Sequence, residues 1–217
     1  MQTPKNGHGE RAMNLFPMFL KLQERPCLVV GAGKIGEAKV RSLLIARARV
    51  HVVAPSVTPP ISAWARTGIL VWSPREFQSD DLASVFLVIA ATSSVEVNDS
   101  VYREARRRNV LCNAVDDPDR SDFYYPAVVR RGDLQIAIST SGSSPALAQR
   151  LRRDFEKQLA PIYAGWVDRL GRLRKELFAR PLDPERRRSV LRGAAARDAF
   201  GAGDTTDFVV REVGHEG

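Results

Sequence analysis

Residues 27–36, CLVVGAGKIG, decide the fold. Residues 27–30 are apolar, and residues 37–47, after the stretch, are predicted to form a helix. A buried strand that runs into a Gly-x-Gly-x-x-Gly turn and then a helix brings free backbone N–H groups and the positive end of the helix dipole to one point. Because that point suits a pyrophosphate, the stretch favours dinucleotide binding over an ordinary turn. The three glycines are Gly31, Gly33 and Gly36.

Composition bounds the size of the core and the kind of partner. A chain of 217 residues with 44% hydrophobic content can bury one sizeable core and a smaller second unit. The 33 Lys and Arg against 25 Asp and Glu give a net charge of +8. This charge favours anionic partners but does not choose among nucleic acid, acidic lipid and a polycarboxylate ligand.

Cysteine placement and hydropathy predict a cytoplasmic protein that does not enter a membrane. Cys27 and Cys112 both lie in apolar runs and are interpreted as reduced core thiols. No apolar stretch approaches the roughly 18–20 residues of a membrane span, and residues 1–13 lack the apolar centre of a signal peptide. We expect residues 1–13 to be a disordered leader and the fold to begin at Asn14.

Further strands are predicted at residues 50–54, 69–72, 85–91 and 109–115, alternating with segments of helical spacing. This alternation indicates a parallel, doubly wound sheet that binds ligands at the carboxyl ends of its strands. Residues 14–26 are expected to pack beneath the sheet. The first helix is predicted to cover one face of the sheet through a stripe of Ile35, Ala38, Ser42 and Ile45.

The end of the second strand bears on the nucleotide. Pro55 and Ser56 stand where an NAD enzyme often carries an acid for the ribose 2′-hydroxyl. The missing acid counts against methyltransferases that bind S-adenosylmethionine. It leaves the choice between NAD and NADP open. Arg47, Arg49 and His51 could accept a 2′-phosphate or could form a solvated basic edge.

The pattern changes after residue 122. Residues 123–129 and 134–140 predict an antiparallel hairpin, and Ser144 is expected to cap a helix that begins at Pro145. A second helix is expected after Pro161 and a third over residues 185–200, with residues 201–217 disordered. The apolar stripes of the first two helices are Leu147, Leu151, Phe155 and Leu159, and Trp166, Leu170, Leu173 and Leu177.

The motifs follow one another as GAGKIGEAKV, VVAP, AAT, CNAVDDP, DFYYPAVVRRGDLQIAIST and SGSSPALAQRLR. Over residues 14–195 this order resembles the precorrin-2 dehydrogenase and sirohydrochlorin ferrochelatase family, the N-terminal module of siroheme synthase. The resemblance implies an α/β fold with a Rossmann-like NAD-binding domain at 14–122, a dimerisation region at 123–160 and a small C-terminal helical domain at 161–200. We expect this chain to correspond to the dehydrogenase module alone, without the methyltransferase domains of the fused enzyme.

The activity that the resemblance implies is NAD-dependent oxidation of precorrin-2 to sirohydrochlorin by a homodimer. Some relatives also insert ferrous iron, and the sequence leaves open whether this chain does. Iron would then have the tetrapyrrole nitrogens as ligands. No protein metal site is expected, because His8, His51 and His215 are scattered and the cysteines are strand residues.

Site residues carry over from the family by position. Asp116 is the expected catalytic acid or base, and Asn113 would orient it or the substrate. The serine turn falls on Ser139, Thr140 and Ser141. Thr140 replaces the family's usual serine, which puts phosphorylation at that position in doubt. Cofactor contacts are expected at the three glycines, Lys34, Ile35, Pro55, Ser56, Ala91 and Thr92. Four arginines suit a polycarboxylate substrate: Arg130, Arg131, Arg150 and Arg153.

Two other classes of function compete with the enzyme. A nucleotide-sensing Rossmann regulatory domain without catalysis would keep the glycine turn but has no need for NAVDDP or SGSSP. A nucleic-acid-binding protein would use the +8 charge directly. Because the basic residues are spread along several elements instead of forming one stripe, we expect no nucleic-acid partner.

Overall fold

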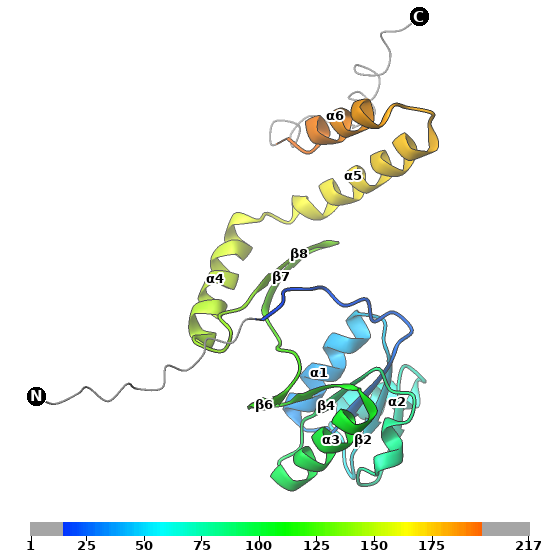
Figure 1. The fold of residues 1–217 in the computed structure, drawn as a ribbon, viewed down its shortest axis with the longest axis vertical. Helices are drawn as coiled ribbons and strands as arrows, with labels where there is room; N and C mark the ends of the chain where they lie inside the picture. The colour runs from blue at the N-terminus through cyan, green and yellow to red at the C-terminus, as the bar shows by residue number, and fades with distance from the viewer. Residues whose placement is uncertain (1–14, 197–217) are drawn as a thin grey trace, which may run out of the picture. The chain divides into compact units, whose positions relative to one another are not determined.

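The computed structural model describes residues 15–196. The chain divides into two compact units, the first ending at Tyr125 and the second beginning at Pro126 (Figure 1). The predicted leader at 1–13 and tail at 201–217 lie outside the described residues. The three predicted domains, 14–122, 123–160 and 161–200, remain predictions.

A six-stranded sheet forms the centre of the first unit. Its order is β3-β2-β1-β4-β5-β6, with neighbouring strands parallel from β3 to β5 and β6 antiparallel to β5. The predicted Rossmann-like parallel sheet is confirmed. The strands are β1 (Pro26–Val30), β2 (Arg49–Val53), β3 (Val71–Ser73), β4 (Leu87–Ala90), β5 (Leu111–Ala114) and β6 (Asp117–Ser121).

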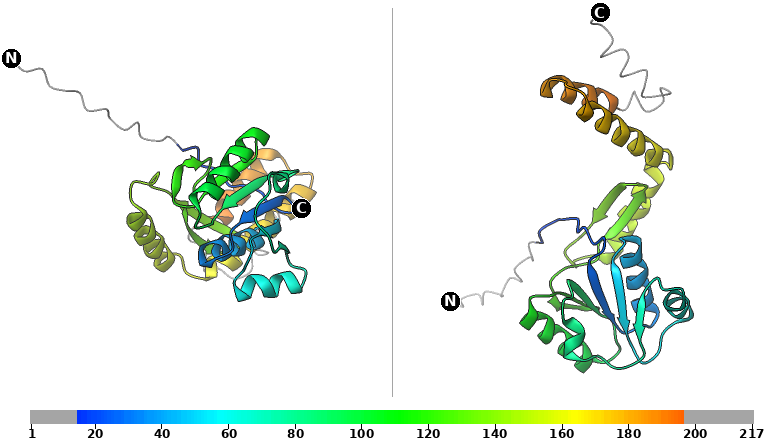
Figure 2. Two further views of the ribbon diagram at one scale, coloured as in Figure 1. Left: turned by 90° about the horizontal axis from the view of Figure 1, so that it is seen from below. Right: turned by 90° about the vertical axis from the view of Figure 1, so that its right-hand side faces the viewer.

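Helices cover both faces of this sheet, as the right-hand view of Figure 2 shows. Val40 of α1 and Ile61 of α2 belong to one core cluster, whereas Val101 of α3 belongs to the other. Strand β4 is buried at every position, as a strand covered on both faces must be. The helices are α1 (Lys34–Ile45), α2 (Pro59–Arg66) and α3 (Val95–Arg108), with a short 3₁₀ helix, η1 (Ser79–Leu82).

The predicted apolar stripe of α1 is wrong. The residues that α1 buries are Gly36, Val40 and Leu43. The predicted stripe of Ile35, Ala38, Ser42 and Ile45 is exposed instead. Both sets have helical spacing, so spacing alone cannot choose between them. The helix starts at Lys34, and the close approach of Gly36 to the Gly31 carbonyl fixes which face meets the sheet.

The segment before β1 does not pack beneath the sheet as predicted. Phe16, Met18 and Phe19 are 79%, 61% and 69% exposed. Leu22 is the residue of this segment that packs against the core. Apolar composition predicted burial here, but the core is already filled by residues of the strands, α1 and α2.

The second unit contains a hairpin and three helices. Strands β7 (Ala127–Arg131) and β8 (Leu134–Ile138) pair antiparallel, as predicted, through a turn in which Gly132 has a φ of +58°. The Ser144 side chain accepts a hydrogen bond from the Leu147 N–H and caps the next helix, as expected. Helices α4 (Pro145–Gln158), α5 (Ile162–Ala179) and α6 (Pro184–Ala194) follow, and α5 and α6 share a small core.

Candidate functional site

The glycine turn after β1 rests directly on the end of β4. A Cβ atom at Gly31 would lie 2.5 Å from the carbonyl oxygen of Ala91, and Gly31 has a φ of +93°. A Cβ atom at Gly36 would collide with the carbonyl oxygen of Gly31. These two positions therefore require glycine for backbone packing.

Gly33 has a different environment. A Cβ atom at Gly33 would have no heavy atom within 4 Å among the described residues. Gly33 is the N-cap residue of α1, and no side chain caps the helix there. The N–H groups of Lys34, Ile35 and Gly36 lie in the first turn, where an α-helix offers them no internal acceptor. The turn thus leaves space and donors for an anion at the positive end of α1.

One further polar group near this turn was not predicted. The Thr58 backbone N–H donates to the Ala32 carbonyl at 3.3 Å. The Thr58 hydroxyl oxygen is buried and has no hydrogen-bond partner among residues 15–196. A glycine cradle with an unsatisfied hydroxyl beside it fits the pyrophosphate and ribose of a dinucleotide.

The ends of β2 and β4 carry the other predicted cofactor contacts. Pro55 and Ser56 follow β2 and are exposed. Ala91 and Thr92 follow β4, and the Thr92 hydroxyl donates to Asn98 Oδ1 at 2.8 Å, so α3 holds this loop. Both pairs stand at the carboxyl edge of the sheet, where doubly wound folds bind ligands.

The basic residues near β2 are at its other end. Arg49 is the first residue of β2, and Arg47 precedes it. The suggestion that they accept a 2′-phosphate is therefore wrong, because the ribose binds at the carboxyl end of the strand. His51 lies between them and that end, bonded to Ser73 Oγ at 2.9 Å, and burial lowers its pKa.

Asp116 stands in the turn between β5 and β6. It is exposed and has a φ of +60°, which aspartate tolerates better than most residues. Asn113, on β5, is only 7% exposed, and its Nδ2 donates to the Phe123 carbonyl at 2.8 Å. Asn113 therefore fastens the segment after β6, a structural contact that the sequence did not predict.

A cation near Asp116 was also missed. Lys39 Nζ lies 3.5 Å from the centroid of the Tyr125 ring. Burial lowers the pKa of Lys39, and the negative charge of Asp116 raises it. Because Lys39 is far from Asp116 and Tyr125 in the chain, no motif or spacing could have revealed the cluster.

The serine turn belongs to the second unit. Ser139 Oγ accepts from the Ser141 N–H at 3.1 Å, and Thr140 Oγ1 accepts from the Ser144 N–H at 3.0 Å. Ser141 has a φ of +52°. Thr140 thus keeps the hydroxyl that holds the turn against the start of α4.

The four predicted arginines differ in their surroundings. Arg131 donates to the carbonyl oxygens of Glu156 and Leu159 at the end of α4, so its guanidinium has a structural role. Arg150 lies 3.7 Å from Asp154 in a surface ion pair. Arg130 and Arg153 are exposed.

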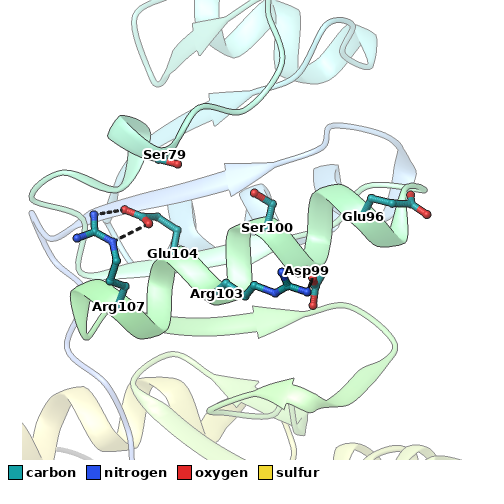
Figure 3. Close-up of a pocket in the computed structure, with 7 residues that line it drawn as sticks. All are labelled: Ser79, Glu96, Asp99, Ser100, Arg103, Glu104 and Arg107. Atoms are coloured by element: carbon teal, nitrogen blue, oxygen red, sulfur yellow. Dashed lines mark hydrogen bonds and ion pairs between the residues drawn. The ribbon is translucent and has the colours of Figure 1, made fainter.

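A surface depression of about 490 Å³ lies along α3, lined by Ser79, Glu96, Asp99, Ser100, Arg103, Glu104 and Arg107 (Figure 3). Both of its arginines are already paired: Arg107 binds Glu104 at 2.6 Å, and Arg103 binds Asp99 at 2.5 Å. This depression therefore offers no unpaired cation to an anionic ligand.

Two further findings concern metals and membranes. Residues 15–196 contain no group of three or more His, Cys, Asp and Glu side chains able to hold a metal ion. Over the same residues, no helix combines the length and apolarity needed to cross a bilayer.

Family models match both units. Residues 18–127 match the model described as putative NAD(P)-binding, and residues 131–158 match the one described as sirohaem biosynthesis protein central.

Curated relatives and a solved structure agree with these matches. Siroheme synthase 1 of Aeromonas hydrophila subsp. hydrophila is 41% identical over 177 residues, covering 81% of this chain and 38% of the relative. Siroheme synthase 2 of Serratia proteamaculans is 43% identical over 159 residues, covering 73% of this chain and 34% of the relative. The chain thus spans well under half the length of these relatives. The solved structure of SirC, precorrin-2 dehydrogenase, has a TM-score of 0.80 and 25% identity, covering 93% of this chain and 100% of that one.

Proposed function

The chain belongs to the precorrin-2 dehydrogenase family, whose fold also forms the N-terminal module of siroheme synthase, and we propose that it oxidises precorrin-2 to sirohydrochlorin with a nicotinamide cofactor. One observation carries the proposal: the Gly31–Gly36 turn and Asp116 stand at the same carboxyl edge of one sheet. An oxidation by hydride transfer needs a dinucleotide and a proton acceptor close together.

In this proposal, different residues of the first unit bind the cofactor and accept the proton. The first-turn N–H groups of α1 and the space at Gly33 hold the pyrophosphate, with Pro55, Ser56, Ala91 and Thr92 as the neighbouring contacts. When bound, the nicotinamide accepts the hydride that the substrate loses. Asp116 accepts the accompanying proton, and its exposure at the tip of the β5–β6 turn allows it to reach a bound substrate.

The cofactor that we propose is NAD⁺. Pro55 and Ser56 at the end of β2 carry no positive charge for a 2′-phosphate. Arg75, after β3, is held by both oxygens of Asp81, at 2.8 and 2.6 Å. Titration calorimetry with NAD⁺ and NADP⁺ tests this choice, and tighter binding of NADP⁺ would reject it.

The substrate contacts that we propose in the second unit are Ser139, Thr140 and Ser141. Two of their hydroxyl oxygens already accept backbone hydrogen bonds, and this shapes the turn. A hydroxyl oxygen that accepts from the backbone can still donate its own proton to a substrate carboxylate.

We also propose that the working unit is a homodimer held by residues 123–160. Leu147 and Phe155 of α4 remain 44% and 37% exposed in the single chain. An amphipathic helix with that much apolar exposure gains stability by pairing with a second copy. The proposed location is the cytoplasm, a reducing compartment consistent with the free, buried thiols of Cys27 and Cys112.

The experiment that tests the function mixes purified protein with NAD⁺ and precorrin-2 and records the absorption spectrum. We expect the sirohydrochlorin spectrum to appear in proportion to NADH. Binding of NAD⁺ without turnover would instead favour a nucleotide-sensing domain. A parallel reaction with ferrous iron as a second substrate tests whether siroheme forms as well.

A further inference from the structure

Lys39 holds a charge in an unusual position. It lies on α1, five residues after the first residue of the helix, and is half-buried. Its ammonium group is 3.5 Å from the centre of the Tyr125 ring, close enough for a cation–π interaction. The aromatic face stabilises the cation but does not neutralise its charge.

No carboxylate within the described chain neutralises Lys39. Among residues 15–196, no Asp or Glu oxygen lies within the 4.0 Å of an ion pair with its Nζ. Asp116 acts on it only at longer range. A half-buried cation without an ion-pair partner has a desolvation cost, which an anionic ligand can offset.

The ring beneath the ammonium belongs to a residue that is 38% exposed, and two contacts hold the segment that carries it. Asn113 donates to the Phe123 carbonyl at 2.8 Å, and the Phe123 and Tyr125 rings are 5.9 Å apart in a tilted arrangement. A buried amide on β5 thus anchors the segment that carries Tyr125. The cation is therefore held on the face of this ring, close enough to Asp116 for the two charges to interact.

We propose that Lys39, supported by the Tyr125 ring, binds a carboxylate of the substrate on the side of the site that carries Asp116. This inference rests on the proposed function, which supplies a polycarboxylate substrate. Lys39 is a substrate-binding residue in this assignment, and Asp116 keeps the proton transfer. The ligand class is a carboxylate, because an ammonium group donates strong charge-assisted hydrogen bonds to carboxylate oxygens.

The test compares Lys39→Met, which removes the charge but keeps the length, with Lys39→Arg, which restores a cation. Arg41→Met is the matched control, because Arg41 lies on the same helix, also contacts an aromatic ring, that of Trp64, and is exposed. We expect Lys39→Met to raise the KM for precorrin-2 about tenfold or more, the effect of one lost charged hydrogen bond. The kcat and the Kd for NAD⁺ should stay within about twofold, a change below 0.5 kcal/mol.

A binding measurement and a second variant make the outcome independent of turnover. Titration with sirohydrochlorin should show the same loss of affinity for Lys39→Met. Lys39→Arg should restore most of that affinity, and Arg41→Met should bind sirohydrochlorin as tightly as the wild type. Tyr125→Leu should weaken binding, whereas Tyr125→Phe, which keeps the ring, should not. Circular dichroism on each sample establishes that the variants fold.

The outcomes separate the two claims. A wild-type protein that does not oxidise precorrin-2 rejects the proposed function itself. An active wild type together with a Lys39→Met variant of unchanged KM and unchanged sirohydrochlorin affinity rejects only the role of Lys39. A fall in kcat alone would also reject carboxylate binding, because the charge would then act on the chemical step.

Discussion

The Cβ atom that any other residue would carry at Gly31 would lie 2.5 Å from the carbonyl oxygen of Ala91. The glycine turn after β1 and the loop after β4 therefore lie in close backbone contact. Gly31 packs against this backbone, whereas Gly33 borders open space at the proposed cofactor site, so substitution at the two glycines separates packing from cofactor binding.

Gly31→Ala should lower stability. The variant forces alanine to a φ of +93° and places its Cβ against Ala91. The backbone conformation alone costs about 1–3 kcal/mol. Gly68→Ala is the control, because Gly68 has a φ of +73° but no heavy atom near its added Cβ. Urea unfolding should show a larger loss at Gly31, and equal losses would contradict the proposed contact.

Gly33→Val should remove NAD⁺ binding and leave the fold intact. No atom lies within 4 Å of a Cβ at Gly33, so the protein alone accommodates a side chain there. A branched side chain would occupy the space proposed for the pyrophosphate. Calorimetry and a thermal melt on one sample measure both effects, and unchanged affinity would place the phosphates elsewhere.

Asp116→Asn should lose most dehydrogenase activity while folding and binding NAD⁺ normally. Asparagine tolerates the positive φ of this position and keeps the shape of the side chain, but it cannot accept the proton. Asp119→Asn is the matched control on the exposed β6 strand. If the Asp116 variant turned over at a near-normal rate, Asp116 would be a turn residue only.

Replacing Leu151 and Phe155 by Glu should give a monomer. Both residues belong to the apolar stripe of α4, and a charge there cannot be buried against a second copy. The monomer should retain NAD⁺ affinity, which belongs to the first unit, and lose precorrin-2 oxidation. Sedimentation and activity are measured together, and a fully active monomer would contradict the requirement for a dimer.

Alkaline pH should destabilise the protein through its thiols. Burial raises the pKa of Cys27 to about 11 and that of Cys112 to about 12, from an ordinary 9.0. Above the ordinary value, the unfolded chain loses protons that the folded protein keeps. The contribution of the two thiols to the free energy of unfolding is therefore fully present below pH 9.0. It declines as the pH rises toward the pKa values that the thiols have in the folded protein. Urea unfolding should show this decline, and a Cys27→Ala/Cys112→Ala variant should show less of it.

Elements with a clear apolar pattern were predictable from the sequence. The apolar residues of β4 and the Ser144–Pro145 start of α4 are each encoded within a few residues, so hydropathy and helix-capping preferences are sufficient to predict them. Strand β6 was missed because Asp117–Ser121 contains a proline and no apolar alternation. Its pairing with β5 depends instead on contacts such as the bond from Asn113 Nδ2 to Ser121 Oγ at 3.3 Å.

The residues of the candidate site could be proposed from the sequence only where they belong to a short motif. Gly31, Gly33 and Asp116 stand in recognisable short stretches. Thr58 and Lys39 do not, because their significance comes from neighbours that the fold alone supplies. The face that α1 buries was misjudged for a similar reason, since two sets of residues have the same spacing and only the contact of Gly36 with Gly31 selects one.

The contact between Gly31 and Ala91 also sets an order of events during synthesis. Strand β1 and the glycine turn leave the ribosome early, but the backbone against which the turn rests is made only when position 91 has been translated. The turn therefore cannot reach its final shape on a shorter nascent chain. A ribosome-bound fragment that stops before β4 should show no protection of residues 31–36 from proteolysis, and binding of the proposed cofactor at this turn must wait until β4 has joined the sheet.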